Sequence, residues 1–389
     1  MKKKIAFITG SRAEYSLLKN LINEYKNYRS CYTFKIIITG MHLQKKFGST
    51  FEEIVKDFPK NYIKIKLNLT KDDKNSINQY ISEGIKKISI FLKKNNFDFV
   101  YVAGDRTEIF AASIACYYMR IPIFHIHGGE VTNGSLDDSI RHSISKMSYA
   151  HFVSHSAYKK RLIQIGENKN HIFNVGALAV DSINKFKFQS KKKLIEKYNL
   201  KIKKKNLLVT FHPDTINNSD NERQIRILLS SISFFDDIYF LFTLPNNDSQ
   251  NSIIIKNIKK YVKQNSNSSV VASLGQLDYF SIINIFDGVV GNSSSGIIEV
   301  PYLNKGIVNI GDRQSGRIMS KKIINTKIET NSIILGIKKL YSTNYQNQIK
   351  KSEKIFGSKN ISKKITQYAN KLVIEKRKFK IFKDIKFKC

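Results

Sequence analysis

The chain has 389 residues, of which 41% are hydrophobic and 11% aromatic, and it carries a formal net charge of +35. This length exceeds one ordinary hydrophobic core, so we expect two folded domains of under about 200 residues each and no extensive disorder. No apolar run reaches the roughly 18 residues that a transmembrane helix needs, so membrane insertion is not expected.

The first ten residues and the cysteines indicate the cellular compartment in which the protein folds. The apolar run in MKKKIAFITG is too short for a secretory signal, and it ends in a strand-to-helix turn rather than a cleavage site. The three cysteines are widely scattered and lack metal-ligand spacing. Both features favour a reduced, cytoplasmic environment.

The positive charge first suggests nucleic acid as a partner. However, the lysines are spread over the whole chain together with abundant Asn and Ile, and no helix-turn-helix, RRM or zinc-finger signature occurs. We therefore expect no nucleic-acid partner. A phosphorylated small substrate would benefit from the same positive field.

The first half alternates short apolar runs with amphipathic segments. Residues 14–25 are predicted to form a helix because Leu17, Leu18, Leu21 and Ile22 share one face. Continuous apolar strands separated by helices indicate a parallel sheet that is covered on both faces. The expected strands are 4–9, 34–39, 97–103, 121–126, 146–153 and 172–175, and further helices are expected at 77–94 and 156–165.

A lysine-rich stretch, residues 191–205, is interpreted as a linker to a second α/β series. There the expected strands are 207–211, 239–244, 270–272, 288–291 and 306–310, with helices at 224–231 and 279–286. The predicted fold class is α/β, with two Rossmann-like parallel-sheet domains and an active site in the cleft between them. We place these domains at residues 1–185 and 186–360, followed by a C-terminal helix and basic tail, 361–389, that is solvated or weakly docked.

Polar residues recur where strands end, which is where α/β sheets bind their ligands. In ITGSRAEYS, Gly10 permits a tight turn, Ser11 caps a helix, and Arg12 lies at a helix N-terminus that attracts anions. A capped helix with a solvent-facing arginine explains this motif equally well. In VAGDRTE, Asp105 and Arg106 either form an ion pair that holds the turn or serve as an acid-base group beside a phosphate-binding arginine.

The segment IPIFHIHGGEVTNGSLDDSIRHSISKM gathers many titratable residues at one strand end, which is typical of a reaction centre. We interpret His125 as a core residue. Glu130, Asp137 and His127 have no evident structural duty and are the candidate acid-base groups.

Two of the acidic residues in this segment also fit structural roles. Ser135 and Asp138 have the spacing of a capping box, so we interpret Asp138 as a helix cap. Asp137 and Arg141 are four residues apart, as in a surface ion pair on a helix.

In the second half, FHPDT places His212 at a strand end and TLPNND does the same for Asn246. The motif GNSSSGIIE is interpreted as a phosphate cradle of backbone N–H groups, hydroxyls and a helix dipole, with Glu299 available to a ribose diol. A serine-rich capped helix start is the alternative. Arg313 and Arg317 add positive charge.

These motifs follow one another between Gly10 and Arg317 as GSRAEYS, TGMH, GDR-E, HIHGGE, DDSIRHSISKMS, FHPDT, GNSSSGIIEVP and NIGDRQSGR. In this order and spacing the chain resembles, over most of its length, the hydrolysing UDP-N-acetylglucosamine 2-epimerases of bacterial sialic acid biosynthesis. The resemblance implies the GT-B fold, in agreement with the two expected domains.

The resemblance also implies a reaction. UDP is eliminated from UDP-N-acetylglucosamine as the C2 proton is removed, which gives 2-acetamidoglucal. Water then adds with inversion at C2 and releases N-acetylmannosamine. Such chemistry needs a base for C2, an acid or cation for the departing diphosphate, and groups that deliver water.

By the same resemblance, Asp105 and Asp137 match the family's essential acids, and Glu130 matches a further acid. His127 stands where many members have a glutamate that is implicated in catalysis, so the identity of the C2 base stays open. The implied catalytic residues are Asp105, His127, Glu130, Asp137 and His212. The implied nucleotide-sugar contacts are Arg12, Ser16, Arg106, Asn246, Ser293, Ser294, Glu299 and Arg317.

No cofactor and no metal are expected, and the family commonly forms homodimers or homotetramers. A related hydrolysing enzyme that acts on UDP- or GDP-linked 2,4-diacetamido-2,4,6-trideoxy sugar (N,N'-diacetylbacillosamine) for legionaminic acid is the main alternative. A non-hydrolysing epimerase, a GT-B glycosyltransferase and a nucleotide-sugar sensor are less favoured. The sensor would lack the carboxylate set that includes Asp105 and Asp137.

Overall fold

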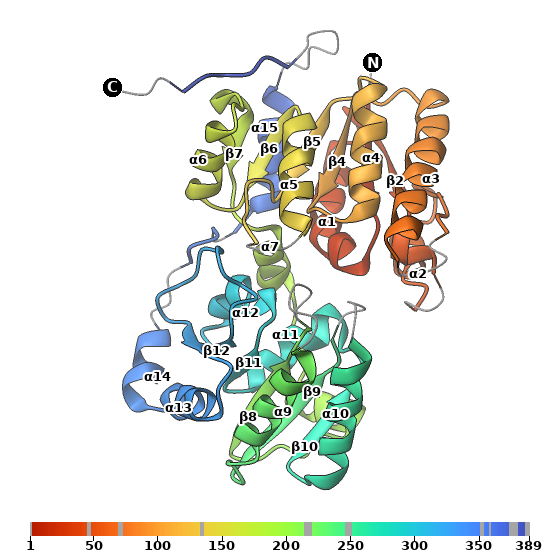
Figure 1. The fold of residues 1–389 in the computed structure, drawn as a ribbon. Helices are drawn as coiled ribbons and strands as arrows, with labels where there is room; N and C mark the ends of the chain where they lie inside the picture. Colours follow the sequence, from red (N-terminus) through yellow and green to blue (C-terminus); the bar gives the residue numbers. More distant parts are fainter. Residues whose placement is uncertain are drawn as a thin grey trace. The chain divides into compact units, whose positions relative to one another are not determined.

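A computed structural model describes residues 2–44, 48–68, 73–132, 136–213, 220–245, 251–350, 354–357, 359–372 and 380–385. The chain divides into two compact units. The first unit comprises Met1–Val131, Leu136–Ser182 and Phe356–Cys389, and the second comprises Thr132–Ser135 and Ile183–Ile355. Each unit contains its own parallel sheet with helices on both faces (Figure 1). The expected α/β class with two Rossmann-like units is confirmed.

The sheet of the first unit has seven strands in its described part, in the order β3-β2-β1-β4-β5-β6-β7, and each neighbouring pair is parallel. The strands are β1 (Lys3–Thr9), β2 (Tyr32–Ile38), β3 (Tyr62–Lys64), β4 (Phe99–Ala103), β5 (Ile123–Ile126), β6 (Ala150–Val153) and β7 (Ile172–Asn174). The helices are α1 (Arg12–Tyr25), α2 (Phe51–Asp57), α3 (Lys74–Lys93), α4 (Thr107–Tyr118), α5 (Leu136–Met147), α6 (Ser156–Gln164), α7 (Leu178–Lys185, which crosses into the second unit) and α15 (Ile361–Lys371).

Alternate residues of the central strands face opposite helical layers. Ala6 and Val100 pack in the core that α3 and α4 cover. On the other face, the Phe7 ring stacks on Tyr101 with the ring centroids 5.1 Å apart, and the Tyr101 hydroxyl lies 2.8 Å from the Tyr25 hydroxyl of α1. Because both faces are buried, the strands are apolar throughout, which is why the sequence pattern located them.

The second unit has a six-stranded parallel sheet in its described part, in the order β10-β9-β8-β11-β12-β13. The strands are β8 (Lys205–Thr210), β9 (Ile238–Thr243), β10 (Ser268–Val271), β11 (Gly288–Gly291), β12 (Gly306–Ile310) and β13 (Ile324–Thr326). Its further helices are α8 (Lys191–Tyr198), α9 (Asn221–Ile232), α10 (Asn251–Gln264), α11 (Gly275–Ile285), α12 (Ser294–Ile298), α13 (Thr330–Leu340) and α14 (Thr343–Ile349). Residues of α9, α10 and α13 pack on one face, and residues of α8, α11 and α12 pack on the other.

Two sequence expectations about secondary structure are wrong. Residues 146–153 are not one strand, because α5 continues to Met147 and the Ser148 amide still bonds to the Ser145 carbonyl before β6 begins. Residues 191–205 are not a plain linker, because they contain α8. The Ser190 side chain accepts from the Lys193 amide and so caps this helix, and Leu194 is buried in the core of the second unit.

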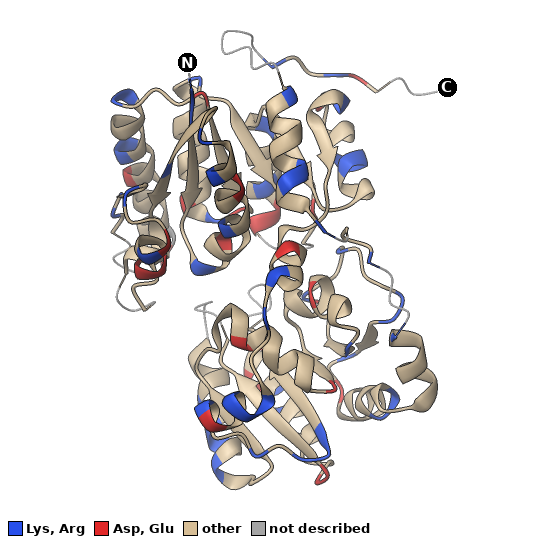
Figure 2. Cartoon of the chain, turned by 180° about the vertical axis from the view of Figure 1, so that it is seen from behind, with Lys and Arg blue, Asp and Glu red and all other residues tan. Residues whose placement is uncertain are grey.

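Lysine and arginine residues are distributed along the backbone of both units (Figure 2). This placement agrees with the dispersed lysines of the sequence. No helix of the described residues is long and apolar enough to cross a membrane.

The C-terminal segment is part of the first unit. Asp181 accepts hydrogen bonds from the backbone amides of Ile361 and Ser362 and thereby holds the start of α15. Beyond α15, the Lys380 ammonium ion-pairs with Glu167. It also donates to the backbone oxygens of Ser145 and Lys146, at 3.1 and 2.8 Å. The expectation of a solvated or weakly docked tail is therefore wrong at Lys380.

Lys380 balances a buried carboxylate. Glu167 is only 1% exposed and also contacts His151, which is fully buried, and Lys146, whose ammonium is half-exposed. A buried carboxylate that loses a cationic partner keeps its desolvation penalty. Lys380 thus contributes to the stability of the first unit.

We expect Lys380→Met to lower the stability of the protein by about 1–3 kcal/mol, because Glu167 loses one charged partner. Thermal unfolding would measure this as a fall in Tm of several degrees. Lys383→Met is the matched control, since Lys383 contributes only its backbone amide, which donates to the Gly166 carbonyl. Equal melting temperatures for the two variants would contradict the role of Lys380.

Candidate active site

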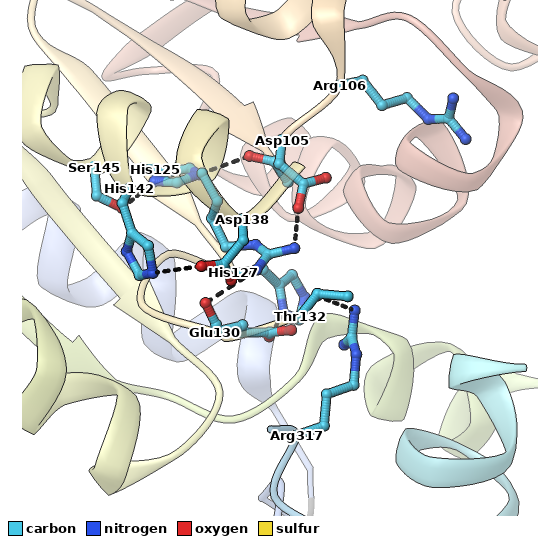
Figure 3. Close-up of polar contacts among 12 residues, drawn as sticks. Asp105, Arg106, His125, His127, Glu130, Thr132, Asp138, His142, Ser145 and Arg317 are labelled. Atoms are coloured by element: carbon cyan, nitrogen blue, oxygen red, sulfur yellow. Dashed lines mark hydrogen bonds and ion pairs between the residues drawn. The ribbon is translucent and has the colours of Figure 1, made fainter. Parts of the chain in front are cut away.

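The candidate residues of the first unit follow the carboxyl ends of β4 and β5, which are neighbours in the sheet. Gly104 has φ +75° and lets the chain turn after β4, so that Asp105 precedes α4. His127 follows β5 with φ +65°, a conformation that few residues other than glycine adopt. Figure 3 shows these side chains together with residues of α5.

Arg141 of α5 joins the ends of both strands. Its guanidinium is 4% exposed and donates to the Asp105 carboxylate and to the Glu130 backbone oxygen, the latter at 3.0 Å. Burial lowers the pKa of Arg141, but the charges of Asp105 and Glu130 outweigh burial and raise it. The hypothesis that Asp105 pairs with Arg106 to hold the turn is wrong, because the ion-pair partner of Asp105 is Arg141.

The two aspartates of α5 have different surroundings. Asp138 lies 3.3 Å from Arg141 and 3.6 Å from the His142 ring. Its interpretation as a helix cap required Ser135, which lies outside the described residues. Asp137 is exposed in the first turn of α5, and its charge acts on both Arg106 and Glu108. Asp137 is therefore within electrostatic range of the turn that follows β4.

His125 is a core residue, as expected. It is fully buried, with Nε2 2.8 Å from the Gly104 carbonyl and Nδ1 3.0 Å from the Ser145 hydroxyl. Burial lowers the pKa of His125 to about 3, so the ring is neutral at physiological pH. His125 thus holds the turn after β4 against β5 and α5.

His127 has a different environment two residues later. Its Nδ1 lies 2.8 Å from Oε1 of Glu130, and the same oxygen accepts from the Ser154 hydroxyl at 3.0 Å. Ser154 directly follows β6, the next strand of the sheet. Ser154 was not among the predicted site residues, although the rule that strand ends carry site residues applies to it as well.

Arg106 lies beside two buried acids, Glu14 and Glu108, that were also not among the predicted site residues. Glu14 is 5% exposed, accepts from the Gly10 amide at 2.6 Å and has Oε1 3.7 Å from Arg106 Nε. Burial and the neighbouring Glu108 raise the pKa of Glu14 to about 8. Burial likewise raises the pKa of Glu108. One of these carboxyl groups is therefore protonated near neutral pH.

Gly10 has a packing role. A Cβ built on Gly10 would lie 2.2 Å from Glu108 Cγ, and a Cβ on Gly40 would lie 2.7 Å from Glu108 Oε1. The Glu108 side chain thus fills the space that the two glycines leave. Nearby, the Ser11 side chain caps α1, as expected, and the predicted ligand residues Arg12 and Ser16 are half-buried in its first two turns.

In the second unit, the carboxyl ends of β8 and β11 bring His212 and Asn292 together. The Asn292 side chain accepts from the His212 amide at 2.7 Å and donates to the His212 carbonyl at 2.8 Å. His212 is 5% exposed, and burial with the nearby Arg313 lowers its pKa to about 3. Asn292 was not among the predicted site residues, although it begins the serine motif.

The serine motif forms a capped helix start. The Ser293 side chain accepts from the Ser295 amide, Ser294 begins α12, and Glu299 follows its last residue. Arg317 donates to the hydroxyl of Thr132, which clusters with the second unit, at 3.3 Å. Asn246 lies outside the described residues. The nucleotide-sugar roles of all these residues stay predictions.

Two Rossmann-like parallel sheets in one chain, each with polar side chains at the carboxyl ends of its strands, define the GT-B fold class. The family model described as UDP-N-acetylglucosamine 2-epimerase matches residues 26–370, and the chain belongs to this family.

Curated relatives and a solved structure agree with this membership. The chain is 39% identical over 346 residues to a GDP/UDP-N,N'-diacetylbacillosamine 2-epimerase (hydrolyzing) of Campylobacter jejuni, with 89% of each chain covered. It is 38% identical to the Polysialic acid biosynthesis protein P7 of Escherichia coli, over 86% of this chain and 85% of the relative. The UDP-GlcNAc 2-epimerase of Neisseria meningitidis, solved with UDP-GlcNAc, shares the fold with a TM-score of 0.82 at 21% identity, over 95% and 100% of the two chains.

We expect Glu14→Gln to change the pH dependence of stability. The folded protein holds the Glu14 proton up to about pH 8, whereas an unfolded chain releases it near 4.5. The folded state binds more protons in this window, so the free energy of unfolding falls as pH rises through it. Glutamine still accepts from the Gly10 amide and does not ionise.

The stability of Glu14→Gln relative to wild type should therefore rise by about 3 kcal/mol between pH 5 and pH 8. Thermal melts at several pH values measure it, with the exposed Glu222→Gln as control. Parallel Tm curves for wild type and Glu14→Gln would contradict the raised pKa.

Proposed function

We propose that this protein is a hydrolysing nucleotide-sugar 2-epimerase. It cleaves a UDP- or GDP-linked 2-acetamido sugar and releases a free sugar with inverted configuration at C2. The observation that carries the proposal is the cluster of Asp105, His127 and Glu130 at adjacent strand ends, together with Arg141 of α5. The similarity of the chain to a relative named as a hydrolysing 2-epimerase supports the same activity.

The cluster contains the groups that an elimination followed by rehydration requires. Asp105 is held in place by its ion pair with the buried Arg141 guanidinium. Asp137 is exposed in the first turn of α5. His212, neutral at physiological pH because its pKa is lowered, offers a hydrogen bond rather than a charge to a bound nucleotide.

Two substrates are candidates. The name of the Campylobacter jejuni relative favours UDP- or GDP-linked N,N'-diacetylbacillosamine, the precursor in the legionaminic acid alternative. The name of the Escherichia coli relative favours UDP-N-acetylglucosamine, because polysialic acid is built from a sugar that derives from N-acetylmannosamine. The product is the first free sugar of either route.

A substrate panel separates these candidates. Purified protein should convert one of UDP-N-acetylglucosamine, UDP-N,N'-diacetylbacillosamine or GDP-N,N'-diacetylbacillosamine to the free nucleoside diphosphate and a free 2-epimeric sugar. In heavy water the product should carry one deuterium at C2, which NMR detects. A product that still bears the nucleotide, or no product from any of the three, would overturn the hydrolysing assignment.

We expect Asp105→Asn to lower kcat by about 10²- to 10⁴-fold, because an amide neither exchanges a proton nor neutralises Arg141. UDP affinity, measured by calorimetry, should change little. Asp138→Asn is the matched control, since it removes the other carboxylate beside Arg141. Equal losses of kcat in the two variants would show that Asp105 acts only through the ion pair.

A further inference from the structure

The turn that carries His127 is fixed from several sides. Arg141 donates to the Glu130 carbonyl at 3.0 Å, and Arg161 of α6 donates to the Gly129 carbonyl at 2.5 Å. His127 itself has φ +65°, which a β-carbon makes unfavourable. Side chains from α5 and α6 thus hold the backbone in one conformation and set the direction of the His127 ring.

The protonation of the His127 ring follows from its partner. An ionised carboxylate only accepts hydrogen bonds. Oε1 of Glu130 therefore accepts from the Ser154 hydroxyl and from Nδ1–H of His127, at 3.0 and 2.8 Å. The neutral ring then has its lone pair on Nε2. Among the described residues, Nε2 is buried and has no hydrogen-bond partner.

The two acids at the ends of β4 and β5, Asp105 and Glu130, are engaged. Oε1 of Glu130 already has two donors, and Glu130 is 5% exposed. Asp105 is ion-paired with Arg141. An unpaired ring nitrogen beside an oriented carboxylate has the geometry of a general base whose conjugate acid is stabilised by its neighbour.

We propose, on the basis of the function proposed above, that His127 is the base that removes the C2 proton and that Glu130 and Ser154 position it. The lone pair of Nε2 takes the proton, and the C2–H electron pair forms the C1–C2 double bond. The bond between C1 and the phosphate oxygen breaks, and its electron pair leaves with the nucleoside diphosphate. The Glu130 carboxylate then stabilises the imidazolium.

Inversion at C2 requires that the returning proton arrives on the opposite face, so it comes from a different acid. His127 therefore acts in the elimination and not in the protonation of the glycal. A catalytic base of this kind acts in only one of the two steps, whereas a residue that only shapes the site affects both.

Measuring the elimination and the hydration of the glycal separately tests whether His127 acts in only one of them. His127→Gln should lower kcat for sugar release by about 10³-fold with KM within about threefold. With UDP present, hydration of the free 2-acetamidoglucal, or of its diacetamido counterpart if the panel selects that sugar, should stay within about tenfold of wild type. Equal losses in both reactions, or near-normal release, would overturn the role of His127 in a protein whose wild type is active. An inactive wild type would instead overturn the proposed function.

The positioning role has its own matched control. Ser154→Ala should lower kcat by about tenfold at unchanged KM, and Ser154→Thr, which keeps the hydroxyl, should recover most of it. Ser145→Ala removes a comparable buried hydroxyl, the one beside Nδ1 of His125, and should leave kcat within about twofold. A similar fall of kcat in both alanine variants would contradict a specific role for Ser154.

Nitrogen NMR reports the tautomer directly. In ¹⁵N-labelled wild-type protein, the His127 ring should show the proton on Nδ1, and Glu130→Gln should shift the ring toward a tautomer mixture while the His125 signals stay in place. An Nε2–H tautomer in the wild type would overturn the proposal, whatever the effect of the variants on activity.

Discussion

The buried guanidinium of Arg141 is the interaction on which the first unit's candidate site depends. It reaches from α5 to Asp105 after β4 and to the Glu130 backbone after β5, and it also contacts Asp138 in its own helix. A guanidinium is always charged and presents its donors in a fixed fork, so it fixes several acceptors relative to one another. Burying it requires the carboxylates around it, because an unpaired charge at this depth would be strongly destabilising. The site and the packing of α5 on the sheet therefore form one structural unit.

The sequence predicted the fold well because both sheets are parallel and covered on both faces. Strands such as β4 and β9 are buried at every residue and appear as uninterrupted apolar runs. The same pattern fails at boundaries where a helix and a strand share an apolar stretch, as at the end of α5. It also fails at α8, because lysines on the exposed face of a helix resemble those of a solvated linker until Leu194 is seen to be buried.

The sequence predicted where the candidate site lies better than it predicted which residues form hydrogen bonds and ion pairs there. The strand-end rule located Asp105, His127 and Glu130, which the topology brings to adjacent strands. Contacts between residues far apart in sequence were not accessible, since Arg141 pairs with Asp105 across 36 residues and Ser154 reaches Glu130 across 24. The acids Glu14 and Glu108 resembled ordinary helix-start residues. Their burial beside Gly10 and Gly40 became evident only from the contacts at the turns after β1 and β2.

His125 and His127 illustrate how environment separates two identical residues. Both ring nitrogens of His125 are within hydrogen-bond distance of partners, and its lowered pKa keeps it neutral, so it serves the core. His127 lies beyond the strand, where the left-handed backbone turns its ring to a carboxylate and leaves one nitrogen unpaired among the described residues. The partners of His125 come from the turn after β4 and from α5, and Ser154 after β6 donates to the Glu130 carboxylate that His127 contacts. None of these three positions adjoins the motif in sequence. The roles of the two histidines are therefore set by the order of strands in the sheet, which a local motif does not encode.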